Sequence, residues 1–153
     1  MDILQVLRPL EQLERKLAEF YQWLADLFEA DSEVAFTFHR MFLEERTHVN
    51  LIEYQRRLAR GNPGAFGDIE VDLAGVEKAI ATIDALRDNG GPPSLERAVR
   101  VALELESGAA LTHLRSAIRQ SSPDMARLLD SLGKGDRQHQ RALRQLAERR
   151  GLA

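Results

Sequence analysis

The chain has 153 residues, no cysteine and a net charge of −3 from 21 basic and 24 acidic side chains. The length suffices for one domain with a substantial core. Without cysteine, the chain has no disulfide, thiolate zinc site or iron–sulfur cluster of its own. The nearly balanced charge predicts neither nucleic acid nor an anionic membrane as a partner. Residues 1–5 do not resemble a signal peptide, and no stretch approaches the roughly 18 apolar residues of a membrane span, so we expect a cytoplasmic location.

Two long stretches in the first half show apolar residues at three- and four-residue steps, the pattern of helices that bury one face. The first covers residues 3–29 and contains Pro9, which marks either a kink or a later helix start. The second begins after a cap at Asp31 or Ser32 and runs to about Arg60. The link between them is short, so the two helices are expected to be antiparallel neighbours.

The second half follows a long connection, residues 61–93, which contains a shorter amphipathic helix at about 74–88. Two further long helices are expected at about 94–120 and 122–150, each beginning with a serine cap. The sequence has no run with the period-two pattern of a strand. It therefore predicts an all-α fold: a four-helix bundle of two antiparallel hairpins joined by a long crossover, as a single domain over residues 1–153.

Each long helix carries polar residues within its apolar stripe. Burying such groups without partners costs several kcal/mol, roughly the penalty for isolated polar or charged groups in a core. A bound metal ion removes that penalty, because carboxylates and imidazoles are its ligands. The six residues are, in chain order, Glu14, Glu45, His48, Glu106, Asp136 and His139.

The positions of these six residues predict that they meet. All of them lie near the middle of their helices, and the acids are 15 or 16 residues from the expected turns near residues 30 and 121. In antiparallel hairpins, equal distances from the turn mean equal heights. The two halves also repeat: the first acid recurs after 92 positions, and the acid and histidine of the next helix recur after 91. Each hairpin thus contributes one acid and one acid-x-x-His to a single layer.

Four carboxylates and two imidazoles form a ligand set of oxygen and nitrogen that suits iron or manganese, and zinc can occupy it as well. Four carboxylate charges balance two divalent cations, and carboxylates can bridge two ions about 3.5–4 Å apart. We therefore expect two metal ions, with iron as the first choice.

These motifs resemble those of the rubrerythrin-like branch of the ferritin-like superfamily of di-iron carboxylate proteins. In that family a ligand glutamate is followed seven residues later by tyrosine, as Glu14 is followed by Tyr21. The second helix carries Glu-x-x-His, matched by Glu45 and His48. The third helix repeats the acid and the fourth repeats Glu-x-x-His. The resemblance covers essentially the whole bundle.

The sequence departs from the family at Asp136, where glutamate is usual, and at His113, where the repeat places tyrosine. The resemblance implies that Tyr21 hydrogen-bonds a ligand carboxylate. We expect His113 to contact a ligand or to pack in the core, rather than to bind the metal. The acids expected at the ordinary surface are Glu11, Glu19, Glu44 and Glu104.

Two functions remain open from the residues alone. The first is a ferroxidase- or peroxidase-like di-iron oxidoreductase that oxidises Fe(II) with oxygen or peroxide and takes part in iron handling or oxidative-stress protection. The second is a metal-binding helical module without redox turnover, in which Asp136 spoils the second half-site. A third interpretation is a purely structural bundle without metal. We also expect an external electron donor and, because helices this long often bury a further face against a partner, a homodimer or larger homo-oligomer.

Overall fold

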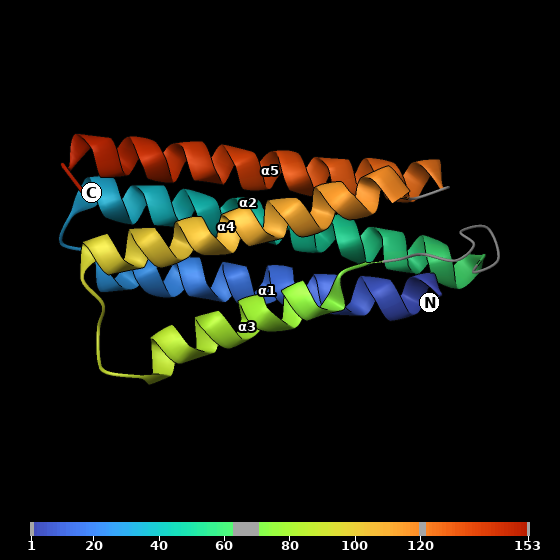
Figure 1. The fold of residues 1–153 in the computed structure, drawn as a ribbon, viewed down its shortest axis with the longest axis horizontal. Helices are drawn as coiled ribbons and strands as arrows, with labels where there is room; N and C mark the ends of the chain where they lie inside the picture. The colour runs from blue at the N-terminus through green and yellow to red at the C-terminus, as the bar shows by residue number, and fades with distance from the viewer. Residues whose placement is uncertain (1, 63–70, 120–121, 153) are drawn as a thin grey trace.

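The computed structural model describes residues 2–62, 71–119 and 122–152, and of residues 114–119 the backbone only. The described residues form helices and no strand, which confirms the all-α class. Four of the helices are long, and the shorter one lies in the connection between the two long pairs (Figure 1). The helices are α1 (Ile3–Leu27), α2 (Ser32–Gly61), α3 (Leu73–Asp88), α4 (Leu95–Arg119) and α5 (Pro123–Arg149).

Side-chain caps fix the helix starts. The Asp2 carboxylate accepts a hydrogen bond from a backbone N–H of the first turn of α1 at 3.0 Å, and Asp31 does the same for α2 at 3.4 Å. Ser122 caps α5 in the same way, ahead of its proline. Helix α1 begins well before Pro9, so the alternative of a later start there is wrong. It ends at Leu27, two residues before the predicted end.

Two antiparallel hairpins make up most of the fold. Helix α1 packs along α2, α4 packs along α5, and the hairpins meet between α2 and α5 (Figure 1). Helix α3 lies against α1 and α4 on the outside of the long helices. The predicted end of the third long helix, residue 120, lies outside the described residues. In the part of the chain that is described, no helix is long and apolar enough to cross a membrane.

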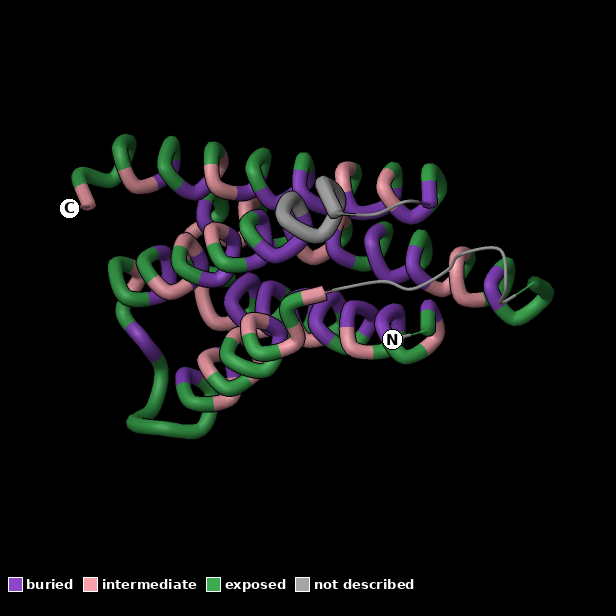
Figure 2. The backbone as a smooth tube through the Cα atoms, turned by 45° about the vertical axis from the view of Figure 1, so that its right-hand side comes forward, coloured by how far each residue is buried: buried purple, intermediate pink, exposed green. Residues whose placement is uncertain are grey.

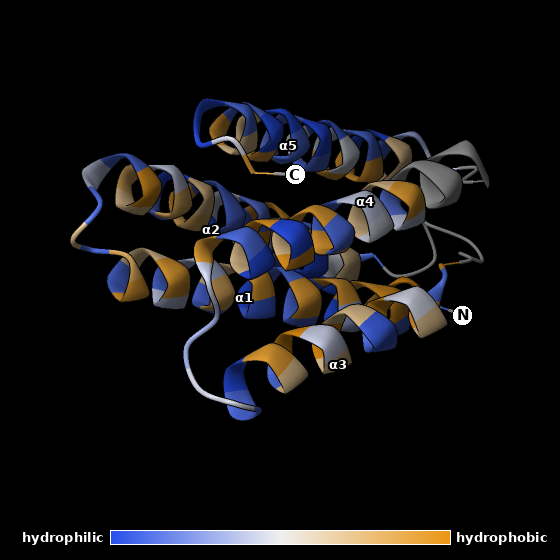
Figure 3. Ribbon diagram, turned by 60° about the vertical axis from the view of Figure 1, so that its left-hand side comes forward, coloured by the Kyte–Doolittle hydropathy of each residue, from blue (hydrophilic) through white to orange (hydrophobic). Residues whose placement is uncertain are grey.

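The apolar core draws on the inward faces of all five helices (Figure 2). Its largest fully buried side chains include Phe20, Tyr21 and Phe38. Burying an apolar side chain of this size stabilises the fold by roughly 1.5–3 kcal/mol. Helix α5 is mostly hydrophilic on the side away from the other helices, as expected for a helix that buries one stripe (Figure 3). Within this core, the long helices also enclose a layer of buried polar side chains.

Candidate metal centre

The six predicted side chains lie in this polar layer, and each is at most 8% exposed. They sit on the inward stripes of four helices because each replaces an apolar residue at a three- or four-residue step. Helix α1 supplies Glu14, α2 supplies Glu45 and His48, α4 supplies Glu106, and α5 supplies Asp136 and His139. The structure thus brings together every residue that the stripes singled out, whereas metal binding by them stays a prediction.

Two groups of possible ligand atoms share Glu45. In the first group, His48 Nδ1 lies 3.2 Å from Glu45 Oε2 and 3.5 Å from Glu14 Oε2. In the second, His139 Nδ1 lies 2.9 Å from Glu45 Oε1 and 3.2 Å from Glu106 Oε1. Within each group the ligand atoms all lie within 4.8 Å of one another. Glu45 therefore presents one carboxylate oxygen to each group.

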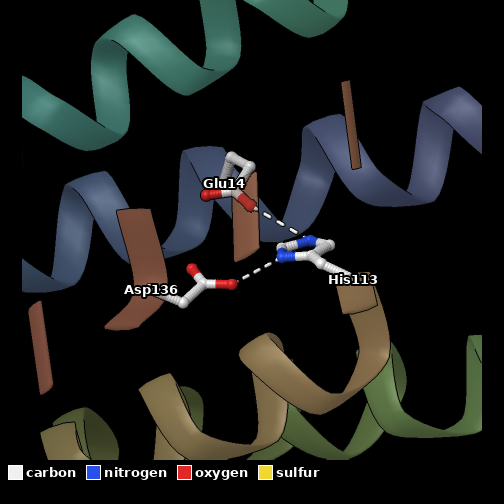
Figure 4. A group of neighbouring side chains, drawn as sticks. All are labelled: Glu14, His113 and Asp136. Carbon is white, nitrogen blue, oxygen red and sulfur yellow. Dashed lines mark hydrogen bonds and ion pairs between the residues drawn. The ribbon is translucent and has the colours of Figure 1, made fainter. Parts of the chain in front are cut away.

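Asp136 and His113 form a third group with Glu14 (Figure 4). His113 Nδ1 lies 2.6 Å from Asp136 Oδ2, and His113 Nε2 lies 3.4 Å from Glu14 Oε1. The imidazole sits between the carboxylates from α1 and α5. His113 makes the predicted contact with a candidate ligand, and it also reaches a second one. Asp136 belongs to this third group and not to that of His139.

Two carboxylate contacts complete the layer around Glu106 and His139. The Tyr21 hydroxyl is fully buried and donates a hydrogen bond to Glu106 Oε1 at 2.5 Å, so the predicted contact of Tyr21 with a carboxylate of the cluster is present. His139 Nε2 lies 2.8 Å from Glu44 Oε2. An imidazole that donates from Nε2 to a carboxylate keeps the lone pair of Nδ1 free for a metal, which is the usual arrangement around histidine ligands.

The expectation that Glu44 and Glu11 are ordinary surface acids is wrong. Glu44 is half-buried because its carboxylate reaches His139. Glu11 is only 8% exposed and accepts a hydrogen bond from Arg56 at 2.6 Å. The signal that finds Glu44 is its position three residues after Met41, at the edge of the inward stripe of α2. Glu19 and Glu104 are exposed, as predicted.

Burial and mutual contact change the acidity of the cluster. Burial, with the neighbouring Glu45 charge, raises the pKa of Glu14 to about 7, and burial raises the pKa of Glu106 to about 7. Burial also acts to raise the pKa of Glu45, but its contacts with Glu14 and the imidazoles outweigh burial and lower it to about 2. Burial acts to lower the pKa of His48, but the contacts with Glu14 and Glu45 outweigh burial and raise this pKa to about 11. Without a metal, the cluster therefore holds protons in place of cations.

Several buried atoms of the cluster have no hydrogen-bond partner among the described residues. Leaving a buried polar atom unpaired costs about 1–3 kcal/mol, so such a concentration needs an explanation. All of these atoms are lone-pair donors on residues of the three groups, and this is the chemistry that a divalent cation requires. The residues present thus fit a metal centre. The atoms are Glu14 Oε1 and Oε2, Glu45 Oε1, Glu106 Oε2, His113 Nε2 and Asp136 Oδ1.

Gly135 makes the room for His48. A Cβ added at this glycine would lie 2.5 Å from His48 Cε1 and Nε2, closer than real contacts allow. The imidazole therefore packs directly on the backbone of α5. The sequence alone does not mark Gly135 as part of the site, because a glycine inside a helix carries no signal of what packs against it.

A pocket of about 590 Å³ opens between α2 and α5, and Glu44 and His139 lie in its wall. His139 is 2% exposed, so only its edge reaches this pocket, whereas the side chain of Glu44 is 34% exposed. The His139–Glu44 pair therefore separates the buried layer from solvent at this point.

Compared with known proteins, the chain matches no family model, no curated protein and no solved structure. The class of site rests on its own geometry. Several oxygen and nitrogen atoms of these buried carboxylates and imidazoles are unpaired, and Glu14 and Glu45 each belong to two of the three groups. This is the composition of a metal centre with oxygen and nitrogen ligands.

Proposed function

We propose that the chain is a ferritin-like protein of the rubrerythrin-like kind that holds two metal ions, iron in the first place, and oxidises Fe(II) with oxygen or peroxide. The observation that carries the proposal is the position of Glu45, which lies within reach of His48 on one side and of His139 on the other. Bridging carboxylates inside a helical bundle are the mark of di-metal carboxylate proteins.

The roles of the ligands follow from the groups. Glu14 and His48 would hold one ion, Glu106 and His139 would hold the other, and Glu45 would be shared by both. When bound, iron would supply the one-electron oxidation chemistry; manganese or zinc fits the same donors. Without metal, Glu14, Glu106 and the imidazoles hold protons, which they would release on binding divalent cations.

The remaining residues of the layer position these ligands. Glu44 accepts the Nε2 proton of His139 and so holds Nδ1 toward Glu45 and Glu106. Tyr21 donates to Glu106 and fixes the rotamer of that carboxylate. The pocket beside Glu44 is wide enough for Fe(II), oxygen or peroxide. An external electron donor would return the centre to its reduced state.

One observation favours the alternative, a metal-binding module without redox turnover. Asp136 contacts His113 and lies outside the group of Glu106 and His139, so the second hairpin contributes no bridging carboxylate to that group. Each of the two groups then has two carboxylates and one imidazole, and Glu45 alone would link the two ions. Stopped-flow absorbance after mixing the ferrous protein with peroxide separates the two functions: fast oxidation supports turnover, and a rate equal to that of free Fe(II) supports the module.

Metal content and thermal stability test the centre itself. We expect two ions per chain after loading with Fe(II) or Mn(II), and a higher melting temperature, because only the folded state assembles the ligands. Glu106→Ala should lose metal, whereas the matched control Glu104→Ala, an exposed acid on the same helix, should not. A protein that binds no ion and melts at the same temperature with and without chelator would be the structural bundle.

A further inference from the structure

Both ring nitrogens of His113 face carboxylates, which is more than a histidine that only packs in a core requires. It is fully buried on α4, and its Nδ1 shares a proton with Asp136 Oδ2 across 2.6 Å. Its other nitrogen, Nε2, faces Glu14 Oε1 at 3.4 Å without making a hydrogen bond. Both of these facing atoms are buried and unpaired. With the proton on Nδ1, the Nε2 lone pair faces a carboxylate oxygen, an arrangement that a proton or a cation near both atoms would stabilise.

The same arrangement occurs at His139, a predicted ligand. There one nitrogen is bound to Glu44 at 2.8 Å, and the other faces Glu45 and Glu106. At His113 one nitrogen is bound to Asp136, and the other faces Glu14. In both cases a carboxylate holds an imidazole with its second nitrogen toward an acid of the cluster, which is how proteins orient histidine ligands.

We propose that His113 is a third imidazole ligand of the centre through Nε2, and that Asp136 is the carboxylate that orients it. The proposal rests on the proposed di-metal function and changes the roles within it. Asp136 is one methylene shorter than glutamate, and its carboxylate contacts His113. Asp136 therefore affects the metal through that imidazole. An ion at Glu14 would then have His113 beside Oε1 of that carboxylate and His48 beside Oε2.

Zinc titration followed by NMR tests this directly, because the chain has four histidines and all can be resolved. In ¹⁵N-labelled protein, long-range ¹H–¹⁵N spectra report which nitrogen of each imidazole is protonated or metal-bound. We expect zinc to move the Nε2 resonance of His113 and the Nδ1 resonances of His48 and His139. Nδ1 of His113 should keep its proton. Exposed His39 is the internal control and should not change.

The outcomes separate this inference from the proposed function. Shifts at His48 and His139 with none at His113 would overturn the inference and leave the di-metal centre standing. No shift at any buried imidazole at saturating zinc would overturn both. As a second variant, Asp136→Asn offers an amide donor to Nδ1 and so moves the proton to Nε2. It should abolish the His113 shift and weaken zinc binding about 10–100-fold, while Asp130→Asn on the surface of α5 should do neither.

A second, independent observation concerns the outer face of α2. Six large apolar side chains are exposed in the described part of the chain, and five of them lie on this helix. Their spacing puts them on one stripe, on the side of α2 opposite to the stripe that carries Glu45. A helix that is apolar on two opposite faces is expected to be covered on both. The five side chains are Phe36, Leu43, Leu51, Tyr54 and Leu58.

Four of these five side chains are placed symmetrically about Thr47, and the counterpart of the fifth, Tyr54, is Arg40. Leu43 and Leu51 lie four residues on either side of Thr47, and Phe36 and Leu58 lie eleven. Two such helices packed antiparallel around a twofold axis at Thr47 place each residue opposite its counterpart.

We infer that a second copy of this chain covers the stripe, with α2 antiparallel to α2 of the partner. Because the chain has no cysteine, single cysteines report the contact cleanly. Thr47→Cys should give an oxidised, disulfide-linked dimer, and Ser131→Cys on the exposed face of α5 should not. Leu43→Cys mixed with Leu51→Cys should cross-link, while either alone should not.

Light scattering gives the mass of the unmodified protein in the same solutions. A monomer at every concentration tested would overturn the inferred dimer, and so would Thr47→Cys linking no faster than Ser131→Cys. Linking of Leu43→Cys to itself would indicate a parallel pair and would overturn the antiparallel arrangement.

Discussion

The two hairpins carry the same motif and use it differently. In α2, Glu45 and His48 stay together, with 3.2 Å between the carboxylate and Nδ1. In α5, Asp136 and His139 have the same spacing but separate, because Asp136 bonds His113 and His139 turns to the glutamates. Aspartate is shorter, and the second hairpin offers it a histidine where the first has a tyrosine. Equal spacing along a helix therefore does not imply equal partners across the bundle.

A second difference lies one residue before each acid. In α2 this position is Glu44, whose carboxylate orients His139 of the other hairpin. In α5 it is Gly135, and here His48 packs directly on the backbone. Each hairpin thus supports a histidine of the other. The Glu44 carboxylate orients His139, and the missing side chain of Gly135 leaves room for the imidazole of His48. The two hairpins of the bundle are therefore complementary at these positions and not identical.

The largest expected effect comes from the acid of each motif. Glu45→Ala removes the carboxylate shared by two groups and should leave the protein with fewer than half of its ions. Asp136→Ala should retain the ion between Glu45, Glu106 and His139 and weaken the ion at Glu14, because Asp136 orients His113 beside Glu14. Elemental analysis after metal loading and gel filtration measures both. Equal losses would mean that the hairpins contribute equally.

Gly135→Ala tests the crosswise support of His48. The added methyl would lie 2.5 Å from the imidazole, so His48 must move, and metal affinity should fall about 10–100-fold. Overpacking should also cost roughly 1–3 kcal/mol of stability. Gly108→Ala is the matched control, because nothing lies within 4 Å of its added carbon. Calorimetric titration with Mn(II) gives the affinities, and unchanged binding in Gly135→Ala would show that His48 is not a ligand.

The pH dependence of the metal-free protein shows where the hairpins behave alike. Glu14 and Glu106 have folded pKa values of about 7, above the ordinary 4.5, so the folded state holds extra protons between these values. Stability must then fall as pH rises from about 4.5 to about 7. His48, with its pKa raised to about 11, adds stability that is complete below 6.5 and is lost as pH rises toward 11. Glu45 acts in the opposite sense, and its contribution is lost as pH falls from 4.5 toward 2.

Melting temperatures followed by circular dichroism should therefore decline from about pH 5 to about pH 8 without metal. The metal-loaded protein should show a growing advantage over the same range, because the ions displace those protons. Glu14→Gln and Glu106→Gln should each flatten the decline by a similar amount. A metal-free melting temperature that rises with pH would contradict the burial of these acids.

The smallest expected effect separates Tyr21 from its counterpart His113. Tyr21→Phe removes one buried hydrogen bond to Glu106 and should cost about 1–2 kcal/mol in denaturant unfolding. Metal content should stay the same, because the hydroxyl only positions a ligand. Tyr54→Phe is the control, since this second tyrosine is 53% exposed. Loss of an ion in Tyr21→Phe would give Tyr21 a role closer to that of His113.

Much of this fold can be predicted from local rules of helix periodicity, capping and turn position. The three- and four-residue periodicity predicts the four long helices, and the acids and histidines on the apolar stripes predict a buried polar layer. Residues such as Asp31 and Ser122 predict where helices start, because a side-chain oxygen there satisfies free backbone N–H groups. The equal distances from the turns predict which residues share one height. Each of these inferences needs only the geometry of a single helix or hairpin.

The tertiary structure decides which of these groups touch. The sequence places Asp136 beside His139, but only the packing of α4 against α5 brings His113 within 2.6 Å of it. The roles of Glu44 and Gly135 likewise depend on the rotation of α2 relative to α5. A side chain on a stripe can face either neighbouring helix, and a small rotation about the helix axis changes its partner. The sequence by itself therefore determined the members of the layer, and the packing of the helices determined their pairing.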